Sequence, residues 1–284
     1  MANLKDIRDR IKSVKAIQQV TSAMKMVAAA KLRRAQERME QARPYSKRLQ
    51  GVIENLLPDV DRGMLDLLEM REVKRVGYLV VTSDRGLAGS FNTSVIKKTE
   101  LEIAEIGKGN SDLFCIGKKG RDYFKKRNYT IIEDHVEFWN ELDFNHAVKF
   151  GNSIISHFLT GKVDEIRVVY NWFKNVGVQE ISLEQLLPLS FSDEIKQYGN
   201  RIFEPSKEKI VQSLIPRHLN TQVWKYLLES YASEQAARMV AMENATENAG
   251  DMIKSLQLEF NKARQSAITT EMLEIVGGAE ALVT

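Results

Sequence analysis

Glycines follow the first predicted strand of the chain, at a kind of turn where many proteins bind phosphate. The turn covers residues 83–92 and reads SDRGLAGSFN. Phosphate binding would use the backbone N–H groups of such a turn at the start of a helix. The turn lacks the third glycine of the dinucleotide fingerprint and the Gly-Lys-Ser/Thr ending of a P-loop, and residues 117–120 (GKKG) supply neither. We therefore expect the turn to pack against a neighbouring surface rather than to bind a nucleotide.

Other reactive side chains lack the spacing that catalysis or metal binding needs. No histidine has a second strong ligand at metal-binding spacing, so we expect ordinary surface or boundary residues at His135, His146, His157 and His218. The chain contains no Gly-x-Ser-x-Gly elbow. The acidic pairs Glu133-Asp134 and Asp193-Glu194 are interpreted as solvated turns. We predict no catalytic residue, no cofactor and no metal site in this chain.

The single cysteine and the hydropathy pattern indicate the cellular compartment in which we expect the protein. Cys115 lies in the apolar run Leu113–Ile116, which predicts a small buried side chain rather than a nucleophile. It can form no internal disulfide, which fits a reducing cytosol. No apolar run approaches the ~18 residues that cross a bilayer, and the first ten residues contain no apolar core of a signal peptide. We expect neither export nor direct membrane insertion.

The two ends of the chain differ in charge although the net charge is only +3. The first forty-eight residues contain thirteen Lys or Arg against four Asp or Glu, an excess of nine positive charges. From Leu219 onward, five basic residues face nine acidic ones, an excess of four negative charges. We interpret most of these charges as solvated helix faces. Their opposite signs indicate that the two ends lie together.

Hydrophobic periodicity predicts a long amphipathic helix at each end of the chain. From Leu4, through Ile17, Val20 and Val27, apolar residues recur in steps of three and four, and this spacing continues to Leu56. A proline at position 44 removes one amide donor and favours a kink. A second stripe covers residues 219–275 without a proline. At the standard rise, a helix of sixty-odd residues is roughly 90 to 100 Å long, so this helix must pack along another helix.

Small side chains mark the faces where the two helices are expected to meet. Alanine recurs every fourth residue from Ala237 to Ala249, and residues 28–30 are all alanine. Small residues let two helix axes approach closely, so we predict an antiparallel two-helix coiled coil, or shaft, formed by residues 1–58 and 207–284. The alternative is an ordinary bundle in which each helix packs on a third element. Both helices are too long for a compact bundle of this mass.

The middle of the chain alternates strands with helices. Strands are predicted over 75–82, 112–116, 129–132, 165–173 and 178–187, and helices over 93–106, 120–127 and 145–159. This order predicts a small, largely parallel, Rossmann-like sheet with helices on both faces, in an α/β domain over residues 73–190. Residues 190–206 are predicted to link this domain to the second long helix.

Short motifs shared with one known family recur in the family's order along the chain. The most distinctive is ITTEMLEIVGGAEA at residues 268–281, preceded by NKARQ at 261–265. The others are IKSV at 11–14, AMKMVAAAKL at 23–32, the glycine turn at 83–92, EPS at 204–206, LES at 228–230 and AARMVAM at 236–242. The chain therefore resembles the gamma subunits of F-type ATP synthases. The resemblance covers nearly the whole chain and is least distinctive between residues 95 and 190.

The resemblance implies the function of a rotor. In the family, the coiled coil turns inside a ring of three alpha and three beta subunits, and its base joins the epsilon subunit and the membrane c-ring. Rotation then couples ion translocation to ATP synthesis or hydrolysis at alpha/beta sites, and the complex implies a peripheral location on the cytoplasmic face of the cell membrane. The partner-contact residues that the resemblance implies are Met24 and Lys25, near acidic loops of beta, and Arg264, Gln265, Thr269, Glu271 and Glu274, where the upper shaft touches the ring. Alternatively, each of these side chains only faces solvent or packs within the coiled coil.

Two functions from other classes stay open. A nucleic-acid-binding coiled coil would account for the basic N-terminal helix, but no aromatic residue precedes Tyr45 and the basic residues are spread around the helix. A Rossmann-type enzyme would account for the sheet, but it would leave both long helices without a role. We expect no binding of nucleic acid.

Overall fold

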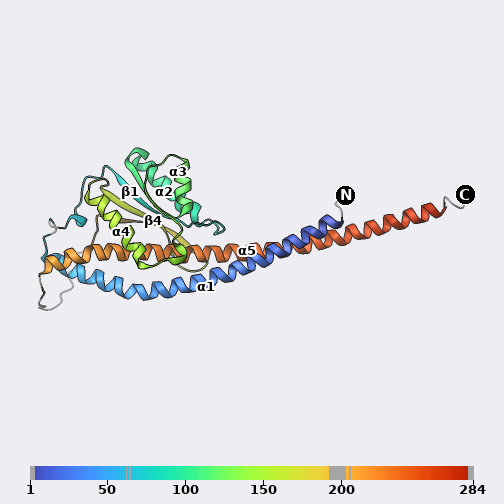
Figure 1. The fold of residues 1–284 in the computed structure, drawn as a ribbon, viewed down its shortest axis with the longest axis horizontal. Helices are drawn as coiled ribbons and strands as arrows, with labels where there is room; N and C mark the ends of the chain where they lie inside the picture. The colour runs from blue at the N-terminus through green and yellow to red at the C-terminus, as the bar shows by residue number, and fades with distance from the viewer. Residues whose placement is uncertain (1–3, 62, 64, 192–202, 205, 281–284) are drawn as a thin grey trace. The chain divides into compact units, whose positions relative to one another are not determined.

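Two long helices and a central sheet make up the computed structural model, which describes residues 4–61, 63, 65–191, 203–204 and 206–280. The chain divides into two compact units, Met1–Val27 with Met239–Thr284, and Ala28–Arg238. Helices α1 (Leu4–Leu56) and α5 (Lys207–Glu280) each contribute to both units. The predicted fold class, long terminal helices with an α/β sheet domain between them, is confirmed (Figure 1).

In the first unit, α1 and α5 pack against each other with opposite directions. Thr21 Oγ1 lies 2.8 Å from Thr246 Oγ1. Arg8, earlier in α1, places its guanidinium 5.6 Å from the ring centre of Phe260, later in α5. This reversed order makes the pair antiparallel. The apolar part of the interface is a small cluster formed by Val14, Ala249, Ile253 and Leu256.

The second unit contains a five-stranded mixed sheet. Its strands are β1 (Val76–Val81), β2 (Ser111–Ile116), β3 (Ile131–His135), β4 (Glu165–Phe173) and β5 (Gln179–Leu187). They lie in the order β3-β2-β1-β4-β5. All neighbours are parallel except β4 and β5, which form an antiparallel hairpin. The expected largely parallel sheet is therefore confirmed.

Helices cover both faces of this sheet (Figure 1). Because strand side chains alternate between faces, Tyr78 and Val80 of β1 pack with α2 (Phe91–Ile106) and α3 (Lys118–Lys126). The opposite face packs on α4 and α5. Helix α4 (Phe144–Leu159) begins with a capping box in which Asp143 and His146 satisfy each other's backbone N–H groups.

Within the second unit, α1 and α5 share one core with the sheet. The α1 side chains of this seam, residues that recur in steps of three and four, are Leu32, Ala35, Met39, Ala42, Ser46, Leu49, Ile53 and Leu56. This spacing is the heptad pattern of a coiled coil. Lys207, at the start of α5, pairs with Asp59, just after α1, whereas Met39 and Glu229 line one pocket. The helices are therefore antiparallel here as well.

Some local predictions were wrong. Strand β3 covers Ile131–His135 and includes Glu133 and Asp134, which we had interpreted as a solvated turn. An edge strand tolerates such charges because one side of it faces solvent. The structure also has short 3-10 helices that no pattern predicted, at Leu57–Asp59, Asp66–Leu68, Lys108–Asn110 and Trp139–Glu141.

Other predictions are settled only in part. Helix α1 continues through Pro44. Asp193 and Glu194 lie outside the described residues, as does most of the predicted linker over 190–206. The domain boundaries that we predicted from sequence stay predictions.

Two glycines offer a matched test of the packing in the second unit. A Cβ atom at Gly151 of α4 would lie 1.9 Å from Asn220 Oδ1 and 3.2 Å from Leu219 Cδ2 of α5, whereas a Cβ at Gly51 of α1 would meet nothing within 4 Å. Gly51→Ala should stabilise the fold by about 0.5–1 kcal/mol, since alanine favours helix. Gly151→Ala should destabilise it by about 1–2 kcal/mol, because overpacking outweighs the same gain. Urea unfolding measures both, and equal effects of the two variants would contradict the close α4–α5 approach.

Candidate partner-contact surfaces

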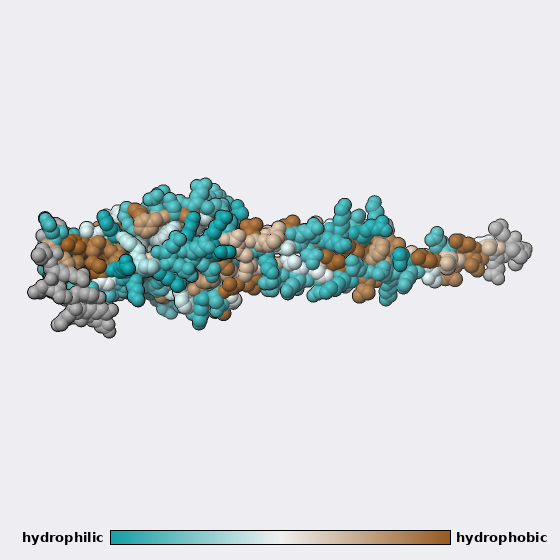
Figure 2. Space-filling model, turned by 90° about the horizontal axis from the view of Figure 1, so that it is seen from below, coloured by the Kyte–Doolittle hydropathy of each residue, from teal (hydrophilic) through white to brown (hydrophobic). Residues whose placement is uncertain are grey.

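The last turns of α5 carry five of the seven predicted contact residues. Every described side chain from Arg264 to Ala279 is exposed, which includes Gln265, Thr269, Glu271 and Glu274. Large apolar side chains are exposed in the same segment, namely Ile268, Met272, Leu273, Ile275 and Val276. Figure 2 shows hydrophobic residues along this end of α5. Four of them, at positions 268, 272, 275 and 276, have the spacing of one helix face, so this face is suited to a partner surface.

The remaining two predicted contact residues lie elsewhere in the first unit. Met24 and Lys25 are both half-buried. Lys25 forms an ion pair with Glu243 of α5, so its charge already has a partner within the chain. The seven predicted residues thus fall into two groups rather than one site.

An exposed apolar face of α1 differs from what the sequence predicted. Ile17, Val20 and Val27 belong to the stripe that we expected to be buried, yet each is more than half exposed. The α5-facing positions are taken instead by Gln18, which donates to Thr246 O, and by Thr21. The stripe therefore divides, and its outer part from residue 17 to 27 is free to contact another chain.

The glycine turn after β1 and the β2–α3 turn that contacts it have structural explanations that need no phosphate. A Cβ at Gly117 would lie 2.1 Å from Thr82 O, so the β2–α3 turn approaches β1 too closely for any other residue. Asp84 accepts hydrogen bonds from the backbone N–H groups of Lys118, at 2.9 Å, and Glu137, at 2.8 Å, and both of its oxygens are used. Leu87, at the tip, is 66% exposed and has a positive φ of 63°. Such a strained, apolar tip is suited to contact with another protein.

A buried arginine that our sequence analysis did not single out as a contact residue holds this turn on α5. Arg238 donates to Gly86 O at 2.6 Å and forms an ion pair with Glu234 one turn earlier. Burial raises the pKa of Glu234, and the charge of Arg238 opposes that shift. We had expected most charges of this helix to be solvated, and these two residues are exceptions. The spacing of four residues was visible in the sequence, but the contact with Gly86, which is distant in the sequence, was not.

Basic residues of α1 in the second unit differ in whether their side chains bind another part of the chain. Lys31 donates to Asn140 Oδ1 at 3.2 Å, and Arg38 donates to Leu142 O at 2.9 Å. Arg33 makes only an exposed helical pair with Glu37, and Arg34 is exposed. Positions 33 and 34 therefore present accessible positive charge, as do Arg43 and Lys47 later in α1.

The histidines have separate structural roles. His135 Nε2 lies 2.6 Å from Glu133 Oε1, and burial lowers the pKa of His135 while Glu133 opposes that shift. His157 Nδ1 lies 2.9 Å from Ser153 O. His218 is 4% exposed, which corrects its interpretation as a surface or boundary residue. The described residues contain no group of three or more His, Cys, Asp or Glu that could hold a metal ion.

Comparison with known proteins places this chain in a family. The ATP synthase family model matches residues 3–282. The chain is 49% identical to the ATP synthase gamma chain of Prosthecochloris aestuarii and 47% identical to that of Chloroherpeton thalassium, with 99% of each chain covered in both cases. The chain belongs to the ATP synthase gamma chain family. As a member of this family, it is a central-stalk subunit of an F-type ATP synthase.

Solved structures of the family agree with the fold. A chain of the Tetrahymena thermophila mitochondrial ATP synthase central stalk and c-ring aligns with 26% identity and a TM-score of 0.63, over 80% of this chain and 99% of that one. A chain of the Euglena gracilis mitochondrial ATP synthase aligns with a TM-score of 0.71 at 21% identity, over 98% and 94% of the two chains. The second likeness concerns the fold alone.

Protonation of the buried His218 should make stability depend on pH. Burial lowers the pKa of His218 from 6.5 to about 4. Between these values the unfolded chain binds the proton and the folded chain does not, so stability falls as the pH falls through this window. The contribution is about 2 kcal/mol between pH 7 and pH 5. His218→Gln should remove this part of the pH dependence in urea unfolding, and an unchanged slope would show that His218 titrates normally in the fold.

Proposed function

We propose that this chain is the rotor that couples ion translocation through a membrane c-ring to ATP synthesis or hydrolysis at alpha/beta sites. Its partners would be a ring of three alpha and three beta subunits, the epsilon subunit and the c-ring. The observation that carries the proposal is the exposed end of α5 from Arg264 to Ala279, where an apolar helix face has no cover among the described residues. A ring of subunits around that end of α5 would cover its apolar face.

The residues proposed to touch the ring divide by chemistry. Arg264, Gln265, Thr269, Glu271 and Glu274 would supply polar contacts beside the apolar face at the end of α5. Met24 and Lys25 would lie near acidic loops of beta, together with the apolar face of α1 from residue 17 to 27. A contact surface made of exposed charges and apolar side chains can release at each step of rotation, whereas a buried ion pair would resist release.

The chain itself is proposed to have no catalytic site, cofactor or metal. The polar and glycine residues at the ends of β1 and β2 serve the fold, since the oxygens of Asp84 accept backbone hydrogen bonds and Gly117 allows a close backbone approach. The described residues include no helix apolar and long enough to span a bilayer. We propose a peripheral location on the cytoplasmic face of the cell membrane, reached through the c-ring.

The purified chain should neither bind nor hydrolyse ATP, because no phosphate cradle or positioned base is expected in it. Calorimetric titration with Mg-ATP should give no binding heat, and a phosphate-release assay should give no turnover. The complex rebuilt with alpha and beta subunits is the positive control. Turnover by the purified chain alone would favour the alternative of a Rossmann-type enzyme.

Charge reversal at the accessible arginines should weaken coupling. Arg33 and Arg34 follow Lys25 by eight and nine residues in α1, and we propose that they also meet the acidic loops of beta. Arg33→Glu with Arg34→Glu places negative charge there, and neither residue holds the fold together. Exposed charge contacts contribute up to about 1 kcal/mol each, so ion pumping per ATP should fall about two- to fivefold at low salt and recover as salt screens the charges. Pumping and ATP hydrolysis are measured together in vesicles containing the complex.

The matched control is Arg33→Lys with Arg34→Lys, which keeps the charge and should pump normally. Lys25 and Lys31 are left intact, because reversing them would break contacts with Glu243 and Asn140. If the Glu variant assembles and pumps at the wild-type ratio in low salt, these arginines do not act in coupling.

A further inference from the structure

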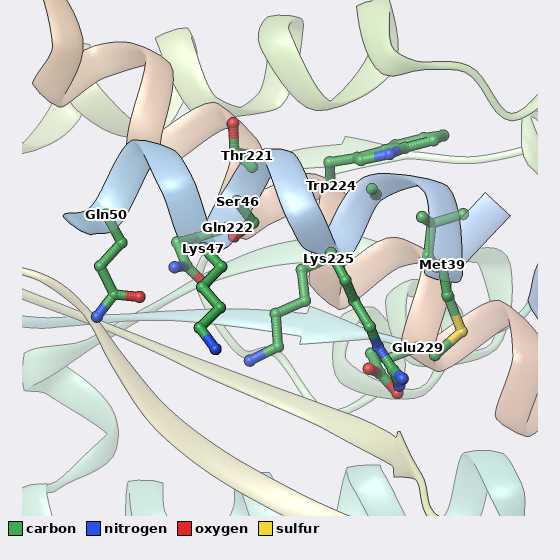
Figure 3. Close-up of a pocket in the computed structure, with 12 residues that line it drawn as sticks. Met39, Ser46, Lys47, Gln50, Thr221, Gln222, Trp224, Lys225 and Glu229 are labelled. Carbon is green, nitrogen blue, oxygen red and sulfur yellow. The ribbon is translucent and has the colours of Figure 1, made fainter. Parts of the chain in front are cut away.

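A pocket lies between α1 and α5 in the second unit, away from the surfaces described so far (Figure 3). Its volume is about 330 Å³. The α1 wall consists of Met39, Ala42, Arg43, Ser46, Lys47 and Gln50, and the α5 wall consists of Thr221, Gln222, Trp224, Lys225, Leu228 and Glu229. The volume falls at the lower end of the range found for small-molecule sites.

The pocket has a cause in the sequence of the seam. Two successive seam positions of α1 are occupied by Ala42 and Ser46, whereas their neighbours Met39 and Leu49 are large and buried. Two helices held apart by large side chains on both sides of a small pair leave a gap opposite the small residues. The gap is thus set by residue size and does not depend on a surface loop.

The walls of the pocket are apolar at the base. Met39 and Leu228 are buried, and Ala42 and Trp224 are half-buried. An indole ring and a thioether adapt well to a flat, apolar body. These side chains therefore favour a ligand with a ring or a short hydrocarbon body.

The rim of the pocket is positive. Arg43 and Lys47 are exposed on α1, and Figure 3 shows Lys47 and Lys225 pointing to the same side from the two helices. Lys225 Nζ lies 3.9 Å from Glu184 Oε2, which is a weak pairing. The one carboxylate in the wall, Glu229, accepts a hydrogen bond from Phe173 N at 3.1 Å, so one of its oxygens is already used. Arg43, Lys47 and Lys225 exceed the two nearby carboxylates, Glu184 and Glu229, by one positive charge, and this excess attracts an anion.

We propose that this pocket binds a small amphipathic anion, a molecule with one apolar body and one carboxylate, sulfonate or phosphate group. The apolar body would lie against Met39, Trp224 and Leu228, and the anionic group would lie at Arg43 and Lys47. Arginine suits such a group because its guanidinium can donate two parallel hydrogen bonds. Because a bound molecule contacts both helices, it stabilises the packing of α1 on α5 and raises the temperature of unfolding.

The test uses the full-length chain and the fluorescent probe anilinonaphthalene sulfonate, which has an aromatic body and one anionic group. Tryptophan excitation also excites Trp139 and Trp172, so the signal for the pocket is the part of the probe emission that is lost in Trp224→Phe. Probe on the exposed end of α5 does not depend on Trp224. Ala42→Leu with Ser46→Leu fills the gap and should weaken this binding at least tenfold. Unchanged binding by a folded filled variant overturns the proposal.

Charge is tested separately at the rim. Arg43→Gln with Lys47→Gln should weaken binding of the anionic probe about tenfold and reduce its salt dependence, while binding of the uncharged analogue N-phenylnaphthylamine should stay the same. Arg10→Gln with Lys12→Gln removes the same charge from exposed positions of α1 outside the pocket and should change neither. Equal losses for both probes, or equal losses in both charge variants, overturn the proposed anion site even if the filled variant fails to fold.

Discussion

An amphipathic helix alone in water leaves its apolar stripe exposed, and α1 and α5 remove part of this exposure by packing on each other. In the first unit, this interface is the only apolar cluster found among the described residues, and polar contacts such as Thr21 with Thr246 continue it. In the second unit, the same two helices share a core with the sheet. Because α1 and α5 pack in opposite directions, the N-terminal and C-terminal segments lie side by side. The strands and short helices of the sheet domain come from the part of the sequence between these two helices.

Buried polar groups fix how α5 lies against the sheet. Glu229 accepts from Phe173 N, Ser233 donates to Asn171 O, and Arg238 donates to Gly86 O. Apolar contacts tolerate a small slide along the helix, but hydrogen bonds from a buried group do not, because an unmet partner would be left without water. The contacts at Phe173, Asn171 and Gly86 therefore hold one register of α5 on the sheet.

Elements with a strong local pattern could be predicted from the sequence, and long-range contacts could not. The long helices and the alternation of strands with helices followed from periodicity, and the burial of Cys115 followed from the apolar run around it. The exposure of Ile17 on the apolar stripe of α1 could not be predicted in this way. Periodicity shows which residues share a face of one helix, but it does not show which element packs on that face. For the same reason the sequence could not place Arg238 at the glycine turn or Lys25 against Glu243. Strand β3 was placed too early because its charged residues, Glu133 and Asp134, look like a turn.

The exposed end of α5 also bears on the lifetime of the chain in a cell. From Arg264 to Ala279 the helix has no cover among the described residues, so its own backbone hydrogen bonds supply most of its order. Such a segment opens at a lower free energy than a packed one, and proteases cut chains where they open. In the proposed complex, a copy bound to its partners would hide this end, whereas a surplus copy would keep it accessible. Under that proposal, the last turns of α5 would be the place where proteases tell an orphan subunit from an assembled one.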